Sequence, residues 1–268
     1  MHRVTRQIGM IILVLLLEVG CRSPSASAPV VSQARPVGEF SIVTLNIAHL
    51  LTQTAPDIVA LQEADGPSFW SGNFDHVQYL AQQAKLPHHT RGSHVNKGRI
   101  DYGTALLSKH PLSKTQSVKF PPSPPTFNKG FVTAELTLPP AKTSGRKATL
   151  TGVSLHLDFS RNSVREKQIR RLVQHLKNVK GPLIIMGDFN CQWPKRDGPL
   201  KTLTHELNLH AYRPESKNLK TYPVFKTRLD WTLISRELRF PQYEVLPERL
   251  SDHFATRATI LFDPDAID

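Results

Sequence analysis

Six short motifs in this 268-residue chain place a polar residue within or directly after an apolar run. They are Thr44-Leu45-Asn46, Leu61-Gln62-Glu63, Leu155-His156-Leu157, Gly187-Asp188-Phe189-Asn190, Leu229-Asp230-Trp231 and Ser251-Asp252-His253. Such residues are costly to bury and cheap to expose at the rim of a sheet, where the catalytic groups of α/β folds gather. Carboxylates, amides and histidines together suit an oxygen-bound cation such as Mg²⁺ beside acid-base groups. The motifs therefore predict an enzyme that hydrolyses phosphoesters.

The elements that would position these motifs alternate between strands and helices. Apolar runs bounded by turn residues predict strands at 40–45, 58–61, 103–108, 131–138, 148–157, 183–186, 229–234, 240–245 and 255–261. Helical spacing predicts helices at 74–84, 163–176 and 200–207, and Ser163-x-x-Glu166 is read as a capping box for the second. The prolines of 120–126 indicate a stiff loop. This order predicts one α/β domain with mixed sheets over residues 39–268.

Composition sets limits on the class of protein. Hydrophobic residues make up 39% of the chain and charged residues 21%, which excludes a disordered chain and a polytopic membrane protein. The 34 Lys and Arg against 22 Asp and Glu give a net charge of +12, a bias toward nucleic acid, anionic lipid or phosphorylated metabolites. The two cysteines, Cys21 and Cys191, provide neither a disulfide framework nor a cysteine-based zinc site.

The order and wording of the motifs resemble the endonuclease/exonuclease/phosphatase superfamily of deoxyribonuclease-like phosphoesterases. The resemblance runs from about Phe40 to Leu261, and its most specific part is Gly-Asp-Phe-Asn at 187–190 followed by Ser-Asp-His at 251–253. It implies an α/β four-layer sandwich, in which two packed mixed β-sheets are flanked by helices. Only 17 positions separate Asn46 from Glu63, which leaves room for barely two helical turns.

The resemblance also implies a role for each residue of the site. It assigns Mg²⁺ or Mn²⁺ to the metal ligands Asn46, Glu63 and Asp252. It assigns catalytic roles to five residues: His156, Asp188, Asn190, Asp230 and His253. Asp188 and Asn190 would orient the attacking water and contact the phosphate or a second metal, and Asp230 would hold His253 beside the scissile phosphate. It implies substrate contacts at Tyr102, Arg165 and Gln168.

Elementary chemistry explains why each of these groups is needed. Hydrolysis of a phosphodiester adds charge to an already anionic phosphorus, and a dication anchored by carboxylates stabilises that charge most effectively. A histidine held by an aspartate, as in His253 and Asp230, is fixed in tautomer, and its imidazolium is stabilised. Asn190 can donate to a phosphate oxygen without adding negative charge.

Residues 1–21 resemble an export signal, with Arg3 and Arg6 before the apolar stretch Ile8–Leu17. Cys21 then stands where the acylated cysteine of a bacterial lipoprotein would be, although Glu18 occupies a position that is normally apolar. Lipidation of Cys21 and plain secretion therefore both stay open. Residues 22–38 read as a flexible tether, which disfavours a cytosolic protein. We expect an exported protein that is periplasmic, secreted or anchored to the cell envelope.

The sequence leaves several substrate classes open. The leading interpretation is a monomeric, metal-dependent phosphodiester hydrolase that acts as an exported nuclease on DNA or RNA, because charge and export both suit external nucleic acid. A phospholipid phosphodiesterase of the sphingomyelinase type or a sugar-phosphate phosphatase is the alternative. A third hypothesis is a non-catalytic binding module, which the intact motifs disfavour. The basic run Arg161–Arg171 is either a solvated helix face or a polyanion contact.

Overall fold

The computed structural model describes residues 39–45, 51–68, 72–138, 148–249 and 251–262. The predicted export signal and tether, and the predicted metal ligand Asn46, lie outside these residues. The elements follow one another as β1 (Glu39–Leu45), α1 (Leu51–Thr54), β2 (Ile58–Asp65), α2 (His76–Gln83), β3 (His88–Lys97), β4 (Ile100–Ser108), β5 (Leu112–Lys119), β6 (Gly130–Leu138), β7 (Ala148–His156), α3 (Asn162–Leu176), β8 (Leu183–Asp188), α4 (Pro199–Glu206), β9 (Leu209–Ala211), β10 (Asp230–Ser235), β11 (Leu238–Val245) and β12 (Thr256–Phe262).

The strands of the described residues form two six-stranded sheets. Sheet A has the order β11-β12-β1-β2-β4-β3, and sheet B has the order β5-β6-β7-β8-β10-β9. The pairs β1–β2 and β7–β8 are parallel, and the other neighbours are antiparallel, so both sheets are mixed as the sequence predicts. No helix in the described part of the chain has the length and apolarity needed to cross a membrane.

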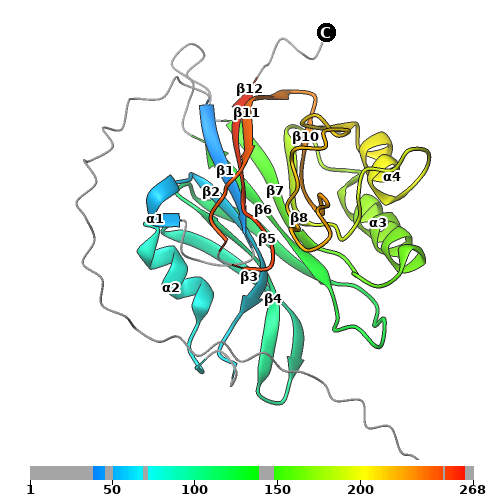
Figure 1. Ribbon diagram of the computed structural model, residues 1–268. Helices are drawn as coiled ribbons and strands as arrows, with labels where there is room; N and C mark the ends of the chain where they lie inside the picture. The colour runs from blue at the N-terminus through cyan, green and yellow to red at the C-terminus, as the bar shows by residue number, and fades with distance from the viewer. Residues whose placement is uncertain (1–38, 46–50, 69–71, 139–147, 250, 263–268) are drawn as a thin grey trace, which may run out of the picture. The chain divides into compact units, whose positions relative to one another are not determined.

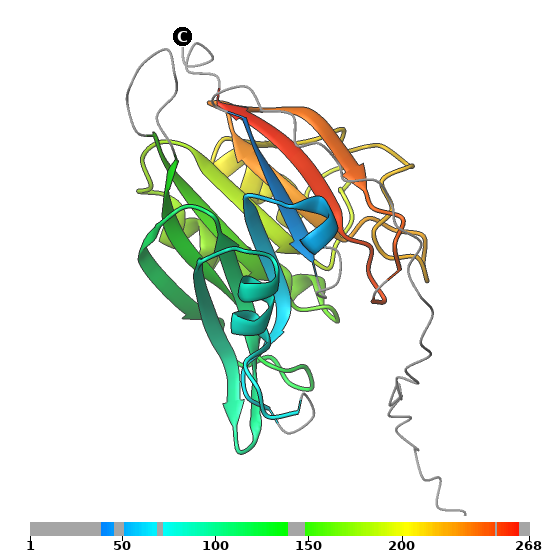
Figure 2. The same cartoon turned by 90° about the vertical axis from the view of Figure 1, so that its left-hand side faces the viewer.

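Alternation of side chains along the central strands builds the layers. In β2, Ile58 and Ala60 join a buried cluster that includes residues of both sheets, whereas Val59 and Leu61 join a cluster with α2. β8 alternates in the same way between the cluster shared by the sheets and a cluster with α3 and α4. Figure 1 shows α1 and α2 on one side of the sheets and α3 and α4 on the other, and Figure 2 looks along this stack from the side of α1 and α2. The predicted four-layer α/β sandwich is confirmed.

The structure adds elements that the apolar pattern does not reveal. β3 and β5 each form one of the two edges of their sheet and are rich in polar residues, because an edge strand with one exposed face needs few apolar side chains. Among the described residues between the two motifs, 51–57, the structure has one short helix, α1.

The predicted capping box at Ser163 and Glu166 is wrong. α3 begins at Asn162 after Arg161, and Arg161 makes no side-chain capping bond. The Asp158 carboxylate instead accepts from the backbone N–H groups of Ser160 and Arg161, and the Asn162 side chain donates to Glu166. These bonds fix the turn that leads into the helix, at N–H groups that precede those that the box was expected to satisfy.

Candidate active site

Sheet B places three predicted catalytic residues in one row at its rim. The register pairs His156 of β7 with Asp188 of β8, and Asp188 with Asp230 of β10. The preceding Gly187 has φ 148, and a Cβ there would stand 1.9 Å from the Leu155 carbonyl oxygen. Glycine therefore lets β8 lie close to β7 immediately before Asp188. The three side chains are buried, with exposed fractions of 3–5%.

Sheet A contributes Glu63 through a β-bulge. The register of β2 on β4 shifts between Gln62 and Ala64, which leaves Glu63 as the extra residue, with φ 53. Bulges re-aim a side chain at the edge of a site, and here the Glu63 side chain remains 44% exposed. The Tyr102 hydroxyl of neighbouring β4 donates to Glu63 Oε1 at 2.6 Å.

The loop before β12 brings the third set of residues. The Ser251 hydroxyl accepts from the His253 N–H at 2.9 Å, which fixes the turn that presents Asp252 and His253. The neighbouring Phe254 N–H donates to the carbonyl of Thr221, a fully buried residue. The Thr221 hydroxyl in turn accepts from the Asp230 N–H at 3.1 Å, so Thr221 ties this loop to the start of β10. No sequence motif singled out Thr221.

These three sources meet at a cleft of about 600 Å³. Seven predicted site residues line it: Glu63, Tyr102, His156, Asp188, Asn190, Asp252 and His253. Asp230 lies behind His253. The structure therefore brings together eight of the eleven predicted site residues, and Asn46 lies outside the described residues.

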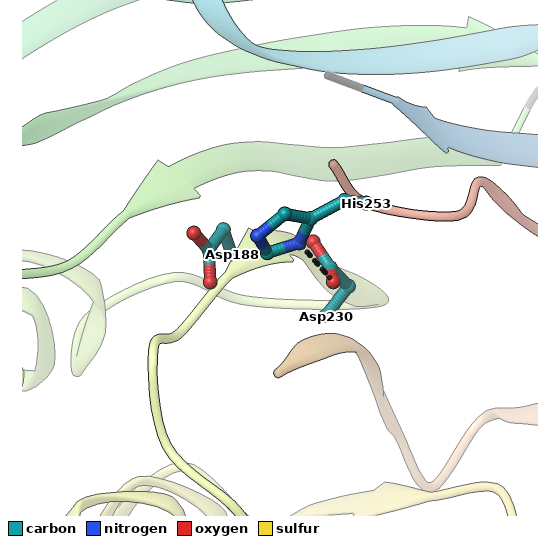
Figure 3. A group of neighbouring side chains, drawn as sticks. All are labelled: Asp188, Asp230 and His253. Atoms are coloured by element: carbon teal, nitrogen blue, oxygen red, sulfur yellow. Dashed lines mark hydrogen bonds and ion pairs between the residues drawn. The ribbon is translucent and has the colours of Figure 1, made fainter. Parts of the chain in front are cut away.

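His253 and Asp230 form a hydrogen-bonded pair that faces Asp188. The distance from His253 Nδ1 to Asp230 Oδ2 is 2.7 Å, and Figure 3 shows the ring between the two carboxylates. Burial of the ring disfavours its charge, but the hydrogen bond to Asp230 and the charges of Asp230 and Asp188 outweigh it and raise the pKa of His253 to about 9. Burial and repulsion from Asp188 also raise the pKa of Asp230. At neutral pH the proton of the pair resides on His253, so the ring is in the protonation state that a general acid needs.

Asp188 is held ionised by its neighbours. Burial opposes its charge, but His156, whose Nε2 lies 3.3 Å from Asp188 Oδ2, and the charge of His253 lower the pKa of this carboxyl. The Asn190 amide donates to Asp188 Oδ2 at 2.8 Å and to the Leu157 carbonyl at 3.0 Å. Asn190 is thereby oriented toward the same carboxylate that the sequence predicts to position water.

Lys129 is a site residue that the sequence analysis missed. It precedes β6, its side chain is only 5% exposed, and its Nζ lies 3.0 Å from the Tyr102 hydroxyl, 3.1 Å from His156 Nε2 and 3.8 Å from Glu63 Oε1. Burial lowers the pKa of Lys129, and the charges of Glu63 and Asp188 oppose that shift. Lys129 stands close before the apolar run of β6. The other site residues were predicted because they are polar residues at the end of an apolar run, and the same criterion could have identified Lys129.

Glu63 keeps its charge because of the same neighbours. Burial of the carboxyl opposes ionisation, but the charges of His156 and Lys129 and the hydrogen bond from Tyr102 lower the pKa of Glu63. Burial and the Glu63 charge raise the pKa of Tyr102 well above its ordinary value, so the phenol stays protonated and donates. Glu63 is thus a fixed, half-exposed carboxylate.

Arg165 and Gln168 do not line the cleft. The Arg165 Nη1 donates to the Asp158 carbonyl at 3.0 Å, and the Gln168 Oε1 accepts from the Asp158 N–H at 2.9 Å. The Asp158 carboxylate accepts from five donors on Ser123, Thr126, Ser160 and Arg161. Arg165 and Gln168 therefore brace the loop that follows His156, and the structure shows them as positioning residues.

Exposed aromatic side chains rim the cleft, and the sequence analysis did not find them. Phe127, Phe159 and Phe225 are 56%, 62% and 73% exposed, and Tyr222 lies with its ring centroid 4.8 Å from that of His253. Cys191 follows Asn190, but burial raises the pKa of its thiol to about 12, so it has no nucleophilic character at neutral pH.

The oxygen ligands of the cleft fit a hard divalent cation. Asp252 is exposed and makes no ion pair or side-chain hydrogen bond within the described ranges, and Glu63 is half exposed. One oxygen from Asp188, one from Asp230 and a nitrogen of His253 also lie within 4.8 Å of one another. In that group His253 Nδ1 is hydrogen-bonded to Asp230 Oδ2 at 2.7 Å, so these two residues are already engaged with each other. The exposed carboxylates are the better ligands.

The chain belongs to the endonuclease/exonuclease/phosphatase family, which it matches over residues 33–253. Members of this family are generally hydrolases of phosphoester bonds that use a divalent metal. No curated protein matches the chain.

Solved structures share the fold at low sequence identity. An endonuclease/exonuclease/phosphatase from Beutenbergia cavernae is 16% identical over 84% of this chain and 72% of that chain, with a TM-score of 0.65. The human Nocturnin catalytic domain with bound sulfate is 21% identical over 84% of this chain and 94% of that chain, with a TM-score of 0.59. D. rerio TDP2 complexed with a single-strand DNA product is 18% identical over 83% of this chain and 98% of that chain, with a TM-score of 0.58.

Proposed function

We propose that the protein is an exported, metal-dependent phosphodiesterase that cleaves nucleic acid. The observation that carries the chemistry is the protonated His253, held by buried Asp230 and next to the ionised Asp188 in one cleft. Hydrolysis of a phosphodiester needs a base for the attacking water and a donor for the phosphate or the leaving oxygen, and these two residues are of those kinds.

The residues of the cleft divide the work. Asp188 and Asn190 orient the attacking water, and Asp188 accepts its proton. His253 donates a hydrogen bond to the phosphate and supplies charge near the leaving oxygen. Lys129 and His156 bind the phosphate from the other wall. Glu63 and Asp252, with Asn46, would hold Mg²⁺ or Mn²⁺, which stabilises the negative charge that develops on the phosphate.

Nucleic acid is the substrate that the surroundings of the cleft favour. Bases stack on exposed aromatic rings, and Phe127, Phe159 and Phe225 present such rings at its rim. The net charge of +12 attracts a polyanion. TDP2, which shares the fold, was solved with a single-strand DNA product, and this adds support from a relative.

A substrate panel tests the proposal. The purified protein is incubated with Mg²⁺ or Mn²⁺ and, separately, plasmid DNA, RNA, sphingomyelin vesicles and inositol phosphates. We expect cleavage of DNA or RNA that stops with a chelator and is lost in Asp230→Asn, which guards against a contaminating nuclease. Cleavage of sphingomyelin alone or of inositol phosphates alone would replace nucleic acid by that substrate. No cleavage of any kind would favour the binding module.

Export is a separate part of the proposal. It rests on the positive start, the apolar stretch Ile8–Leu17 and the following tether. Mass spectrometry of the mature N-terminus tests it in the cells that make the protein. An acylated Cys21 as the first residue indicates an envelope anchor, and an unmodified start after the signal indicates secretion. An intact Met1 in the mature protein would contradict export.

A further inference from the structure

A second cavity, of about 620 Å³, adjoins the catalytic cleft. Gln192 and Thr227 line both cavities, so the two are neighbours on the molecule. We call the second cavity the basic pocket, because five of its lining residues are cationic: Lys195, Lys217, Lys220, Lys226 and Arg228. The lining includes one carboxylate, Glu215. A concave surface with this excess of one sign concentrates oppositely charged groups.

Arg228 is the unusual residue of the basic pocket. Its residue is only 5% exposed, yet no carboxylate in the described part of the chain pairs with it. Its Nη1 donates to the Tyr212 carbonyl at 2.9 Å, whereas Nε and Nη2 have no hydrogen-bond partner among the described residues. The guanidinium lies over two aromatic rings, with Cζ 3.9 Å from the Trp231 centroid and 4.9 Å from that of Tyr243.

A buried cation without an anion is costly to keep. Cation–π contacts with Trp231 and Tyr243 offset part of the cost, but they leave two guanidinium nitrogens without acceptors. The four lysines around Arg228 are exposed, and none makes an ion pair within the described ranges. The charge of the pocket is therefore not neutralised by the protein's own acidic residues, and an external anion would both pair the lysines and compensate Arg228.

We propose that the basic pocket binds a phosphate group of the nucleic-acid substrate, distinct from the phosphate that is cleaved in the catalytic cleft. This inference rests on the proposed function, and it narrows the substrate to a strand of several nucleotides. A substrate with one phosphate occupies the cleft alone, whereas a strand can pass Gln192 and Thr227 and place a further phosphate among the lysines. The pocket thus selects for strand length.

Two substrates of different length test the proposal. Lys217→Ala/Lys220→Ala removes two exposed cations from the pocket and leaves the catalytic cleft intact. For a single-stranded octanucleotide we expect kcat/KM to fall about tenfold at 100 mM salt. The slope of log kcat/KM against log salt should also become shallower, by the amount that corresponds to the loss of one or two phosphate contacts. For bis(p-nitrophenyl) phosphate, which has one phosphate, kcat/KM should stay within about twofold.

A matched variant controls for general electrostatic attraction. Lys177→Ala/Lys180→Ala removes the same charge from exposed residues that precede β8, whose opposite end carries Asp188. We expect this variant to retain nearly all activity on the octanucleotide. Equal losses in the two double variants, or equal losses on both substrates, would overturn the pocket as a phosphate site.

A binding measurement separates this inference from the proposed function. Trp193 and Trp231 line the pocket, so tryptophan fluorescence reports its occupancy. The full chain is titrated in chelator, where cleavage stops, with an octanucleotide and with inorganic phosphate. Binding of the octanucleotide that weakens in Lys217→Ala/Lys220→Ala supports the pocket even if no substrate is cleaved. Binding that this variant leaves unchanged overturns the inference, even if the protein proves to be a nuclease.

Discussion

The two sheets supply the active site with side chains of opposite kinds. Sheet B contributes His156, Asp188 and Asp230, which are 3–5% exposed and fixed by neighbouring side chains or backbone. Sheet A and the loop before its strand β12 contribute Glu63, whose side chain is 44% exposed, and the exposed Asp252. Burial shifts a pKa and fixes a geometry, whereas exposed oxygens can exchange ligands with water.

This difference indicates how the site divides acid-base work from cation binding. Groups that must hold or release a proton at one place are buried and paired on the side of sheet B. Carboxylates suited to a loosely held cation lie on the side of sheet A. His253 joins the two, because the loop before β12 carries it while Asp230 of sheet B sets its pKa. Variants from each side should therefore fail in different ways.

The largest effect is expected from the side of sheet B. His253→Ala removes the protonated ring, and we expect kcat to fall by about three orders of magnitude, because a positioned general acid and its charge act on the transition state. Added metal should not restore activity. The thermal midpoint, measured by calorimetry, should fall only in part, because the variant leaves the buried Asp230 carboxyl without its partner but leaves the core packing intact. Recovery of activity at high Mg²⁺ would place His253 with the cation ligands instead.

Lys129 tests whether a buried cation belongs to the acid-base side. Lys129→Gln removes the charge and shortens the side chain by one atom, and kcat should fall about a hundredfold, the size expected for one preorganised donor. The pKa of Glu63 should rise in this variant, because the Lys129 charge helps to lower it. Lys119→Gln, at an exposed residue of β5, is the matched control and should leave kcat unchanged. An increase in KM with kcat unchanged would show that Lys129 only binds the substrate.

Most of the scaffold could be predicted from the sequence, because buried central strands are marked by uninterrupted apolar runs. β3 and β5 escaped prediction, since polar edge strands lack that signal. The motif residues at strand ends could be predicted from the same apolar runs, because Asp188 and Asp230 directly border apolar residues. Their convergence follows from the strand register, which no local pattern contains.

Residues that act through tertiary contacts could not be predicted. Lys129 contacts Tyr102, and Thr221 contacts Phe254, across long stretches of sequence, and only folding shows that Lys129 and Thr221 are buried. Conversely, Gln168 and Arg165 matched a family spacing but hold the Asp158 loop outside the cleft. A sequence motif identifies which residues are near a site, whereas contact with the cleft depends on where each side chain points.

Asp158 tests how far the rigidity of sheet B's side depends on that loop. Asp158→Asn should lower stability by about 2 kcal/mol at neutral pH, because several hydrogen bonds to a buried carboxylate are weakened. Hydrogen bonds from Thr126, Ser160 and Arg161 outweigh burial and lower the pKa of Asp158 from 3.8 to about 2. The stabilisation is therefore complete above about pH 4 and is lost as the pH falls toward about 2. Thermal midpoints of both proteins across this range should converge in acid, and a constant gap would contradict the assignment.

The smallest effect is expected at Glu63, and it should be of a different kind. Glu63→Gln keeps the shape and the hydrogen bond from Tyr102 but halves the charge that Glu63 and Asp252 offer a cation. We expect the Mg²⁺ concentration for half-maximal activity to rise about tenfold, while kcat at saturating Mg²⁺ falls little, because the acid-base groups are intact. Activity is measured over a Mg²⁺ series in the wild type, in Glu63→Gln and in His253→Ala. The comparison between the sheets stands if only Glu63→Gln is rescued by metal. A loss of kcat in Glu63→Gln that saturating Mg²⁺ does not repair would show that both sheets serve the proton transfer, since an exposed carboxylate that acts only on the cation loses its importance once the cation is in excess.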